Sequence, residues 1–324
     1  MRLFHRPPDP FAFRPVPGVV ESDPSRPSQM PPAADRVTSP SLSGQLAAVA
    51  GGAAVSAVVC CLLDTDPTVP LNAAIATTAP VELLAGVEAL ATVAGGARPI
   101  VVADPDVEAL WAALRPLARR PSKVRLVPLR NDYPQADPSL LLFTLLHRRL
   151  PPGRLPTECG VLLVDGAAAV DVGRSTLAPA SVDVAVRDHF AGRTHLLSVP
   201  TGTALGDVLR FVEVDPAVAL LRAGEFLRDR FVSPDLAVTS AGERVFHATA
   251  RTLAANPDPC VRCGWCVEAC PTRVHPAGLL DAAQQSDPAL AERYGLSGCI
   301  ECGICSYVCP TRLPLLASIR QMKG

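Results

Sequence analysis

Hydrophobic positions follow two patterns between residues 42 and 175. Short runs that are apolar throughout predict buried strands, and longer segments with apolar residues every three or four positions predict helices. The predicted strands are 56–63, 98–103, 124–128 and 160–164, and the predicted helices are 81–94, 106–117 and 139–148. Asp104 is expected to cap the second helix, with Pro105 at its first position. This alternation indicates a Rossmann-like α/β domain, in which helices cover both faces of a parallel sheet.

The pattern changes between residues 176 and 250. Short strand-like segments separated by turns occupy 181–190, 193–202 and 235–246, and 203–212 reads as a single helix that Thr201 or Thr203 would cap. These signals predict a small α+β module of the β-grasp type. Residues 1–41 hold ten prolines and little periodicity, which indicates an irregular arm. The chain thus divides into 1–41, 42–175, 176–250 and a cysteine-rich part at 251–324.

The 18 residues at 46–63 carry no charge and reach the lower limit of length for a membrane span. Their composition is mostly Ala, Gly and Val, and Gly51 and Gly52 interrupt the run. A short helix, a turn and a buried strand are therefore favoured over a span. The start of the chain, MRLFHRPPDP, lacks the apolar core of a signal peptide. We expect a reducing, cytoplasmic compartment, with attachment to the inner membrane surface or enclosure in a microcompartment as further alternatives.

Two runs of four cysteines share one spacing. CVRCGWCVEACP occupies residues 260–271 and CIECGICSYVCP occupies residues 299–310, and every cysteine recurs 39 positions later. This periodicity indicates a duplicated unit. In bacterial two-cluster ferredoxins, the first three cysteines of such a run bind one 4Fe–4S cluster and the fourth binds the other. Cluster one would then take Cys260, Cys263, Cys266 and Cys309, and cluster two would take Cys299, Cys302, Cys305 and Cys270.

A pair of zinc sites is the alternative for these cysteines. Zinc uses four ligands, commonly from Cys-x-x-Cys pairs, whereas the repeated run of four with a following proline is typical of clusters. The spacer between the runs predicts a helix at 276–285 and a second at 288–294 that Asp287 would cap. These helices favour an α-helical, ferredoxin-type dicluster domain.

The remaining candidate ligands are weaker. Cys60, Cys61 and Cys159 lie in apolar surroundings and are interpreted as small buried hydrophobic residues. The six histidines have no ligand spacing, and His275 is expected at a helix start on the surface. A net charge of −1 and 4% aromatic residues give no basis for a nucleic-acid partner.

Three stretches together resemble a known family. They are CIECGICSYVCPTRLPL in the second run, the segment from Asn131 that contains Tyr133-Pro134-Gln135, and RTHLLSVPTGTALGDVL from Arg193. The chain from about residue 45 onward is similar to the C subunit of the Rnf electron-transport complex and to the related cobalamin reductase of propanediol-using microcompartments. The resemblance implies an SLBB-type β-grasp module and a redox complex as the setting.

The resemblance also implies a flavin and NADH site in the Rossmann-like domain, but the motifs that would carry it are not intact. SPSLSGQLAAVAGG stands where the family has its glycine-rich loop, and the family's N-terminal barrel is not recognised. Of the family's acidic turn, only Asp64 and Asp66 give a weak match. A flavin phosphate needs exposed amides at a glycine-rich turn or a helix start. FMN binding is therefore doubtful and NADH binding is not expected.

These patterns favour an electron-transfer protein that relays single electrons through two 4Fe–4S clusters. Its partners would be redox proteins, such as a flavoprotein or a cobalamin enzyme. A flavin-dependent NADH reductase and a docking or scaffold protein of the complex are the alternatives.

Overall fold

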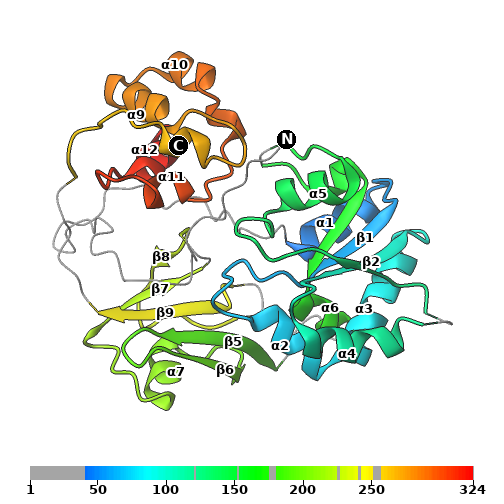
Figure 1. Ribbon diagram of the computed structural model, residues 1–324. Coiled ribbons are helices and arrows are strands. Elements are labelled where there is room, and N and C mark those ends of the chain that lie inside the picture. The colour runs from blue at the N-terminus through cyan, green and yellow to red at the C-terminus, as the bar shows by residue number, and fades with distance from the viewer. Residues whose placement is uncertain are drawn as a thin grey trace. The chain divides into compact units, whose positions relative to one another are not determined.

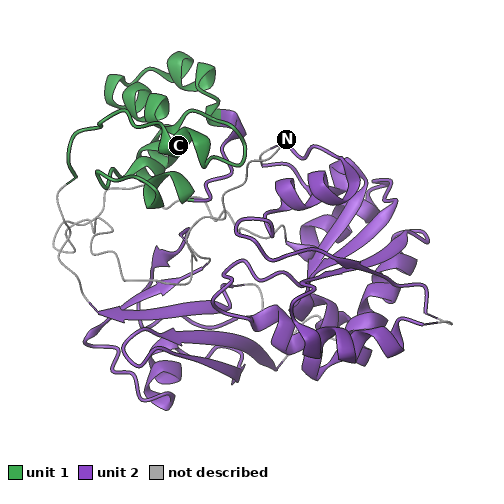
Figure 2. Ribbon diagram, in the orientation of Figure 1, with its two compact units in different colours: residues 1–32, 251–296, 303–324 green, residues 33–250, 297–302 purple. Residues whose placement is uncertain are grey.

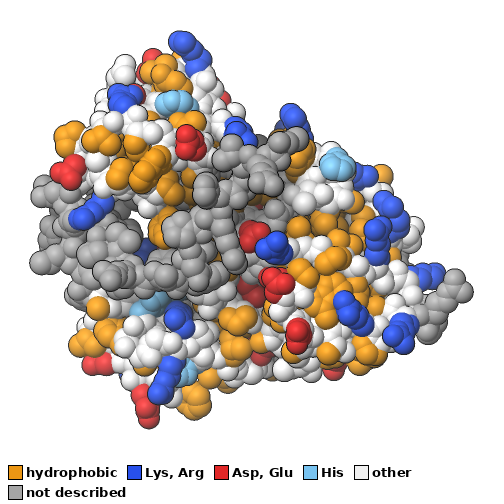
Figure 3. All heavy atoms as spheres, viewed as in Figure 1, with side chains coloured by type: hydrophobic (Ala, Val, Ile, Leu, Met, Phe, Trp, Pro, Cys, Tyr) orange, Lys and Arg blue, Asp and Glu red, His pale blue; other side chains and the backbone are white. Residues whose placement is uncertain are grey.

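The computed structural model describes residues 41–119, 122–151, 153–174, 180–224, 227–239, 242–250 and 257–323. The chain forms two compact units (Figure 2): residues 1–32, 251–296 and 303–324 make one, and residues 33–250 and 297–302 make the other. The predicted irregular arm lies outside the described residues except for residue 41. On the face drawn in Figure 3, side chains of both charge signs are interspersed with hydrophobic ones, in keeping with the net charge of −1.

The larger unit contains a four-stranded parallel sheet in the order β3-β2-β1-β4. Its strands are β1 (Ala57–Cys61), β2 (Arg98–Ala103), β3 (Arg125–Pro128) and β4 (Val161–Asp165). Each lies within a predicted strand or extends at most one residue beyond it. The central β1 is buried at every position because helices cover both of its faces, so its sequence is continuously apolar rather than alternating.

Helices cover the two faces of this sheet (Figure 1). They are α1 (Leu42–Ala50), α2 (Leu71–Thr78), α3 (Pro80–Val93), α4 (Glu108–Leu117), α5 (Pro138–Leu146), the 3₁₀ turn η1 (Pro156–Cys159) and α6 (Gly166–Gly173). On one face α3, α4 and α6 share a core with Val58 and Cys60. On the other face Leu141 and Leu142 of α5 pack against Val59 and Cys61. The Rossmann-like fold class is confirmed.

The stretch at 46–63 adopts the predicted helix, turn and strand. Helix α1 ends at the Gly51–Gly52 turn before β1 begins. Gln45 of α1 is fully buried, and its side-chain amide both donates to the carbonyl of Leu163 and accepts from its N–H, each at 2.8 Å. These bonds satisfy the outer edge of β4. No single helix among the described residues has the length and hydrophobicity to cross a membrane. Helices α2 and α3 reach that length and hydrophobicity only when taken together, and a bend of 99° separates them.

Helices α3 and α6 approach each other closely because each presents a glycine to the other's backbone. A Cβ added at Gly86 of α3 would lie 1.8 Å from the carbonyl oxygen of Ala169, and one added at Gly173 of α6 would lie 1.9 Å from that of Glu82. Neither contact is compatible with a side chain, so this packing requires glycine at both positions.

A five-stranded mixed sheet follows in the order β6-β5-β9-β7-β8. Its elements are β5 (Ser181–Asp188), β6 (Arg193–Pro200), α7 (Leu205–Phe211), β7 (Ala219–Ala223), β8 (Arg230–Phe231) and β9 (Val245–Ala250). Strands β5 and β9 pair in parallel, whereas the other pairs are antiparallel. Leu205 and Leu209 of α7 pack with Phe246 on one face of this sheet. The module thus has the mixed sheet and crossing helix expected of a β-grasp fold.

Three contacts between a basic side chain and an aspartate link the Rossmann-like domain to the β-grasp module within the larger unit. Arg228 reaches Asp137, the residue that caps α5, at 2.7 Å, and both side chains are less than 10% exposed. Arg244 lies 3.5 Å from Asp171 of α6, and His247 of β9 lies 3.5 Å from Asp66. In the two arginine contacts the first sheet's domain supplies the carboxylate and the second supplies the cation, so the two surfaces are electrostatically complementary at these points.

The smaller unit is helical. It contains α8 (Trp265–Glu268), α9 (Pro276–Gln285), α10 (Pro288–Arg293), α11 (Ile304–Tyr307) and α12 (Leu315–Lys323), with the 3₁₀ turn η2 (Leu296–Gly298) where the two units meet along the chain. The helix predicted at 276–285 is confirmed, and Asp287 caps α10 by accepting from Leu290 N–H at 2.9 Å. Helix α9 packs against α12.

Two predicted caps are wrong. Asp104 does not cap α4, because its carboxylate accepts from the N–H of Asp106 in a turn and the helix begins only after Val107. Neither threonine caps α7, because Ala204 is its N-cap and makes no side-chain bond. In each case the chain makes a further turn before the helix begins.

Gly173→Ala should destabilise the fold, because the added methyl group would overlap the backbone of α3. We expect the free energy of unfolding to fall by about 1–3 kcal/mol or more. Gly51→Ala is the matched control, because its Cβ would meet only ordinary contacts of 3.4 Å. Urea denaturation of both variants measures the difference, and equal midpoints would contradict the close approach.

Arg228→Ala should leave the Asp137 carboxylate buried without its cation. The expected loss of stability is about 3–5 kcal/mol. Arg210→Ala is the control, because its ion pair with Asp207 has both side chains more than 60% exposed and contributes little. Thermal unfolding of both variants tests this, and similar melting temperatures would contradict a stabilising role for the buried pair.

Candidate iron–sulfur site

The two cysteine runs have the same backbone conformation. In each run a glycine in the left-handed region precedes a single helical turn: Gly264 (φ 84°) precedes α8 and Gly303 (φ 78°) precedes α11. Arg262 and Glu301, two positions earlier, also have positive φ values of 54° and 59°. The duplication seen in the sequence therefore extends to the local fold, since the two helical turns are offset by the same 39 residues.

Four cysteines of the smaller unit line one pocket. Its walls include the first three cysteines of the first run and the last cysteine of the second, together with residues that follow each run. The cysteines are Cys260, Cys263, Cys266 and Cys309. Four thiol groups around a single pocket, three of them local and one distant in sequence, fit the ligand set of a 4Fe–4S cluster.

The segment before the first run and the segment after the second hold Cys309 in place at the pocket. The Asp258 N–H donates to the carbonyl of Thr311 at 3.1 Å, which pairs the segment before the first run with the segment after the second. Leu313 N–H donates to the Cys309 sulfur at 3.4 Å. Burial raises the pKa of the Cys266 thiol, and a bound metal would offset this by stabilising the thiolate.

The other four cysteines of the runs are all buried: Cys270, Cys299, Cys302 and Cys305. The sulfur of Cys299 accepts from the N–H of Glu301 at 3.4 Å. Within the described residues, no group of three Cys, His, Asp or Glu side chains is arranged to hold a single metal ion.

The remaining cysteines pack within the Rossmann-like domain. Cys60 and Cys61 are buried on opposite faces of the sheet, and burial raises the pKa of both thiols, that of Cys61 to about 12. Cys159 differs from its prediction, because it lies half-exposed in the η1 turn, where its thiol donates to the Arg149 carbonyl at 3.3 Å. His275 is an exposed N-cap of α9, as predicted, and its Nδ1 accepts from Gly278 N–H.

Asp64 lies at the carboxyl end of β1, where an open parallel sheet would bind a ligand at the change in strand order. Its carboxylate accepts from Asn72 N–H in the first turn of α2 at 2.6 Å. Burial raises its pKa to about 7, although hydrogen bonds from the amides of Asn72 and Ala73 oppose the shift. On neighbouring β4, Asp165 accepts from Ala168 N–H and so caps α6. The carboxylates of buried Asp64 and half-buried Asp165 therefore occupy the helix starts that a flavin phosphate would need, and these residues do not fit that group.

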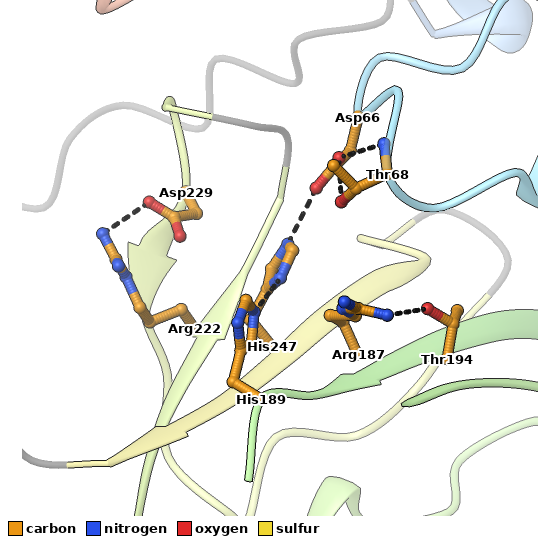
Figure 4. Close-up of polar contacts among 8 residues, drawn as sticks. All are labelled: Asp66, Thr68, Arg187, His189, Thr194, Arg222, Asp229 and His247. Atoms are coloured by element: carbon orange, nitrogen blue, oxygen red, sulfur yellow. Dashed lines mark hydrogen bonds and ion pairs between the residues drawn. The ribbon is translucent and has the colours of Figure 1, made fainter. Parts of the chain in front are cut away.

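Asp66 is directed to the β-grasp sheet (Figure 4). One carboxylate oxygen accepts from both the N–H and the hydroxyl of Thr68, and the other lies 3.5 Å from His247 Nε2. The other ring nitrogen of His247 lies 3.3 Å from His189 Nε2. Burial lowers the pKa of both histidines, that of His189 to about 4. Asp66 thus serves as a contact between modules, and no periodicity or spacing in the sequence indicated these histidine partners.

Comparisons with known proteins agree with the cysteine pattern. Residues 252–310 match the 4Fe–4S dicluster domain family. The chain is 31% identical over 211 residues to the C subunit of the ion-translocating oxidoreductase complex of Rhodobacter capsulatus, a match that covers 62% of this chain and 40% of the relative. Identity to the protein of the same name from Pasteurella multocida is 29% over 233 residues, 69% of this chain and 28% of the relative.

A solved NAD⁺-reducing [NiFe]-hydrogenase in the H₂-reduced state is similar in fold, with a TM-score of 0.50 at 15% identity over 91% of this chain and 62% of the other. This likeness concerns the fold alone. The chain covers less than half the length of the two curated relatives. The comparisons confirm the resemblance to the C subunit of Rnf-type complexes and the presence of a 4Fe–4S dicluster domain.

Asp64→Asn should change how stability depends on pH. The wild-type carboxyl titrates near pH 7 when folded and near 3.8 when unfolded, so its contribution is fully present below pH 3.8 and is lost as pH rises through 7. The stability of the variant relative to wild type should therefore increase by about 4 kcal/mol between pH 4 and pH 8. Denaturation across this range measures it, with the exposed Asp106→Asn as control, and parallel wild-type and Asp64→Asn curves would contradict the buried titration.

Proposed function

We propose that this protein is an electron-transfer subunit that relays single electrons through two 4Fe–4S clusters within a redox complex of the Rnf type. The observation that carries the proposal is the pocket lined by Cys260, Cys263, Cys266 and Cys309. Cys309 is brought to the other three by the fold, which is the interlocked arrangement that the repeat predicts. The 39-residue repeat assigns the second cluster to Cys299, Cys302, Cys305 and Cys270.

The residues of the chain have defined roles in this proposal. When bound, each cluster supplies one reversible one-electron step, with a potential that its surroundings set. The cysteine thiolates would hold the iron, and the left-handed conformations at Gly264 and Gly303 turn the backbone sharply between these cysteines. In this assignment each run would provide three ligands to one cluster and one to the other, so the two runs would hold the clusters as neighbours.

We further propose that hydride chemistry belongs to a partner and not to this Rossmann-like domain. Asp64 and Asp165 accept from amides in the first turns of α2 and α6 at the carboxyl edge of the sheet, so these amides are already paired and are not free to bind a flavin or nucleotide phosphate. Electrons would pass to or from another redox protein, for which a flavoprotein or a cobalamin enzyme is suitable. Association at the inner surface of a membrane or within a microcompartment is consistent with this role.

Anaerobic purification tests the proposal through the iron, sulfide and flavin content of the protein. We expect about eight irons and eight sulfides per chain, with an electron paramagnetic resonance signal on reduction. Cys263→Ser and Cys302→Ser should each remove the signal of one cluster and about half of the iron. Cys159→Ser, outside the runs, is the control and should leave both clusters in place.

Zinc in place of iron, or unchanged iron in both run variants, would contradict the relay. Yellow protein that releases flavin on denaturation would favour the NADH reductase instead. A variant that lacks both clusters distinguishes the scaffold function, because only a scaffold would still support full turnover of the assembled complex.

A further inference from the structure

Two threonines occupy equivalent positions beside the cysteines that connect the clusters. Thr272 and Thr311 each follow the last cysteine of a run by two residues, in the repeated sequence Cys-Pro-Thr-Arg. The Thr311 hydroxyl oxygen lies 3.4 Å from the Cys309 sulfur, and the Thr272 hydroxyl oxygen lies 3.6 Å from the Cys270 sulfur. The same contact between threonine and cysteine therefore occurs in both copies of the repeat.

A tight turn produces this contact in both copies. The N–H of Arg273 donates to the carbonyl of Cys270 at 3.2 Å, and the N–H of Arg312 donates to that of Cys309 at 3.1 Å. Proline suits the second position of such a turn because its φ angle is already set. The arginine that closes each turn has a positive φ, 61° at Arg273 and 58° at Arg312. The turn folds the threonine side chain back onto the sulfur of its own cysteine.

The threonine of the second copy is held more firmly. Thr311 is only 8% exposed, and its carbonyl accepts from the N–H of Asp258 at 3.1 Å. A buried hydroxyl needs a hydrogen-bond partner, and the Cys309 sulfur lies within reach of this one. Thr272 lies in a partly buried position, so its hydroxyl is closer to solvent.

The chemistry of the ligand sets the direction of the bond. A cysteine bound to iron is a thiolate and has no proton to donate, so the threonine hydroxyl must donate to the sulfur. Reduction adds negative charge to the cluster and its sulfur ligands, and a donor to sulfur stabilises that charge. Such a bond raises the reduction potential of the cluster that the cysteine binds.

We propose that the Thr311 and Thr272 hydroxyls are positioning groups that raise the reduction potentials of clusters one and two, respectively, by donating to Cys309 and Cys270. This inference rests on the proposed function, because it requires the two clusters. Each threonine acts on the reduction potential of one cluster, so substitution of one threonine changes one potential without the other. Thr311, the more deeply buried donor, has the larger effect.

Thr311→Val tests the inference because valine keeps the shape of the side chain and removes the donor. Purified anaerobically as the full chain, the variant should retain its iron, while one of the two transitions in a redox titration followed by electron paramagnetic resonance moves to a more negative potential. Thr272→Val should move the other transition by a smaller amount. Resonance Raman spectra should show altered iron–thiolate stretching in both variants.

Thr311→Ser and Thr157→Val are the controls. Serine restores the hydroxyl, so it should return the potential toward that of wild type, and Thr157 is a buried threonine outside the runs whose substitution should leave both transitions unchanged. Wild-type potentials in Thr311→Val protein with a full iron content would overturn the inference, as would equal shifts in the Val and Ser variants. Wild-type protein without clusters would instead overturn the proposed function.

Discussion

The helical unit depends on bringing Cys309 back to the pocket that Cys260, Cys263 and Cys266 line. These ligands are separated by more than forty residues, and the chain between them must leave and return. Helices α9 and α10 form most of the chain between the two runs, and α12, which follows the second run, packs on α9. A backbone hydrogen bond from Asp258 N–H to the Thr311 carbonyl then joins the two ends. Metal binding would contribute directly to the stability of this unit, because its core otherwise consists of short helices.

The Rossmann-like domain keeps its architecture while its ligand-binding edge is occupied by its own side chains. Asp64 and Asp165 satisfy helix amides there, and Asp66 turns toward His247 on the second sheet. These carboxylates link the domain's own elements and its β-grasp neighbour in place of a phosphate. The fold and the ligand are thus separable, since a parallel sheet with covered faces is stable without any cofactor at its edge.

Much of the fold follows from local patterns. The four strands of the first sheet and helices α3, α5 and α9 were predicted because long apolar runs or clear helical periods mark them. Helices α2 and α6 were missed because they are short and rich in Ala, Asn, Thr and Gly, so their periodicity is weak. The cap predicted at Asp104 failed because a turn competes for the same carboxylate. Gly86 and Gly173 appear ordinary in sequence, and only the approach of two helices gives them a role.

The sequence by itself determined the cysteine repeat, the α/β alternation and the order of the modules, because each depends on spacing along the chain. Tertiary structure decided which groups lie together: Cys309 with the first run, Asp137 with Arg228, and Asp66 with the histidine pair. Such contacts join residues that are distant in sequence, and no local pattern encodes them. Burial, which also depends on the tertiary structure, changes the acidity of side chains. The Asp64 carboxyl, which would be ionised in water, titrates near pH 7 because the fold removes it from solvent.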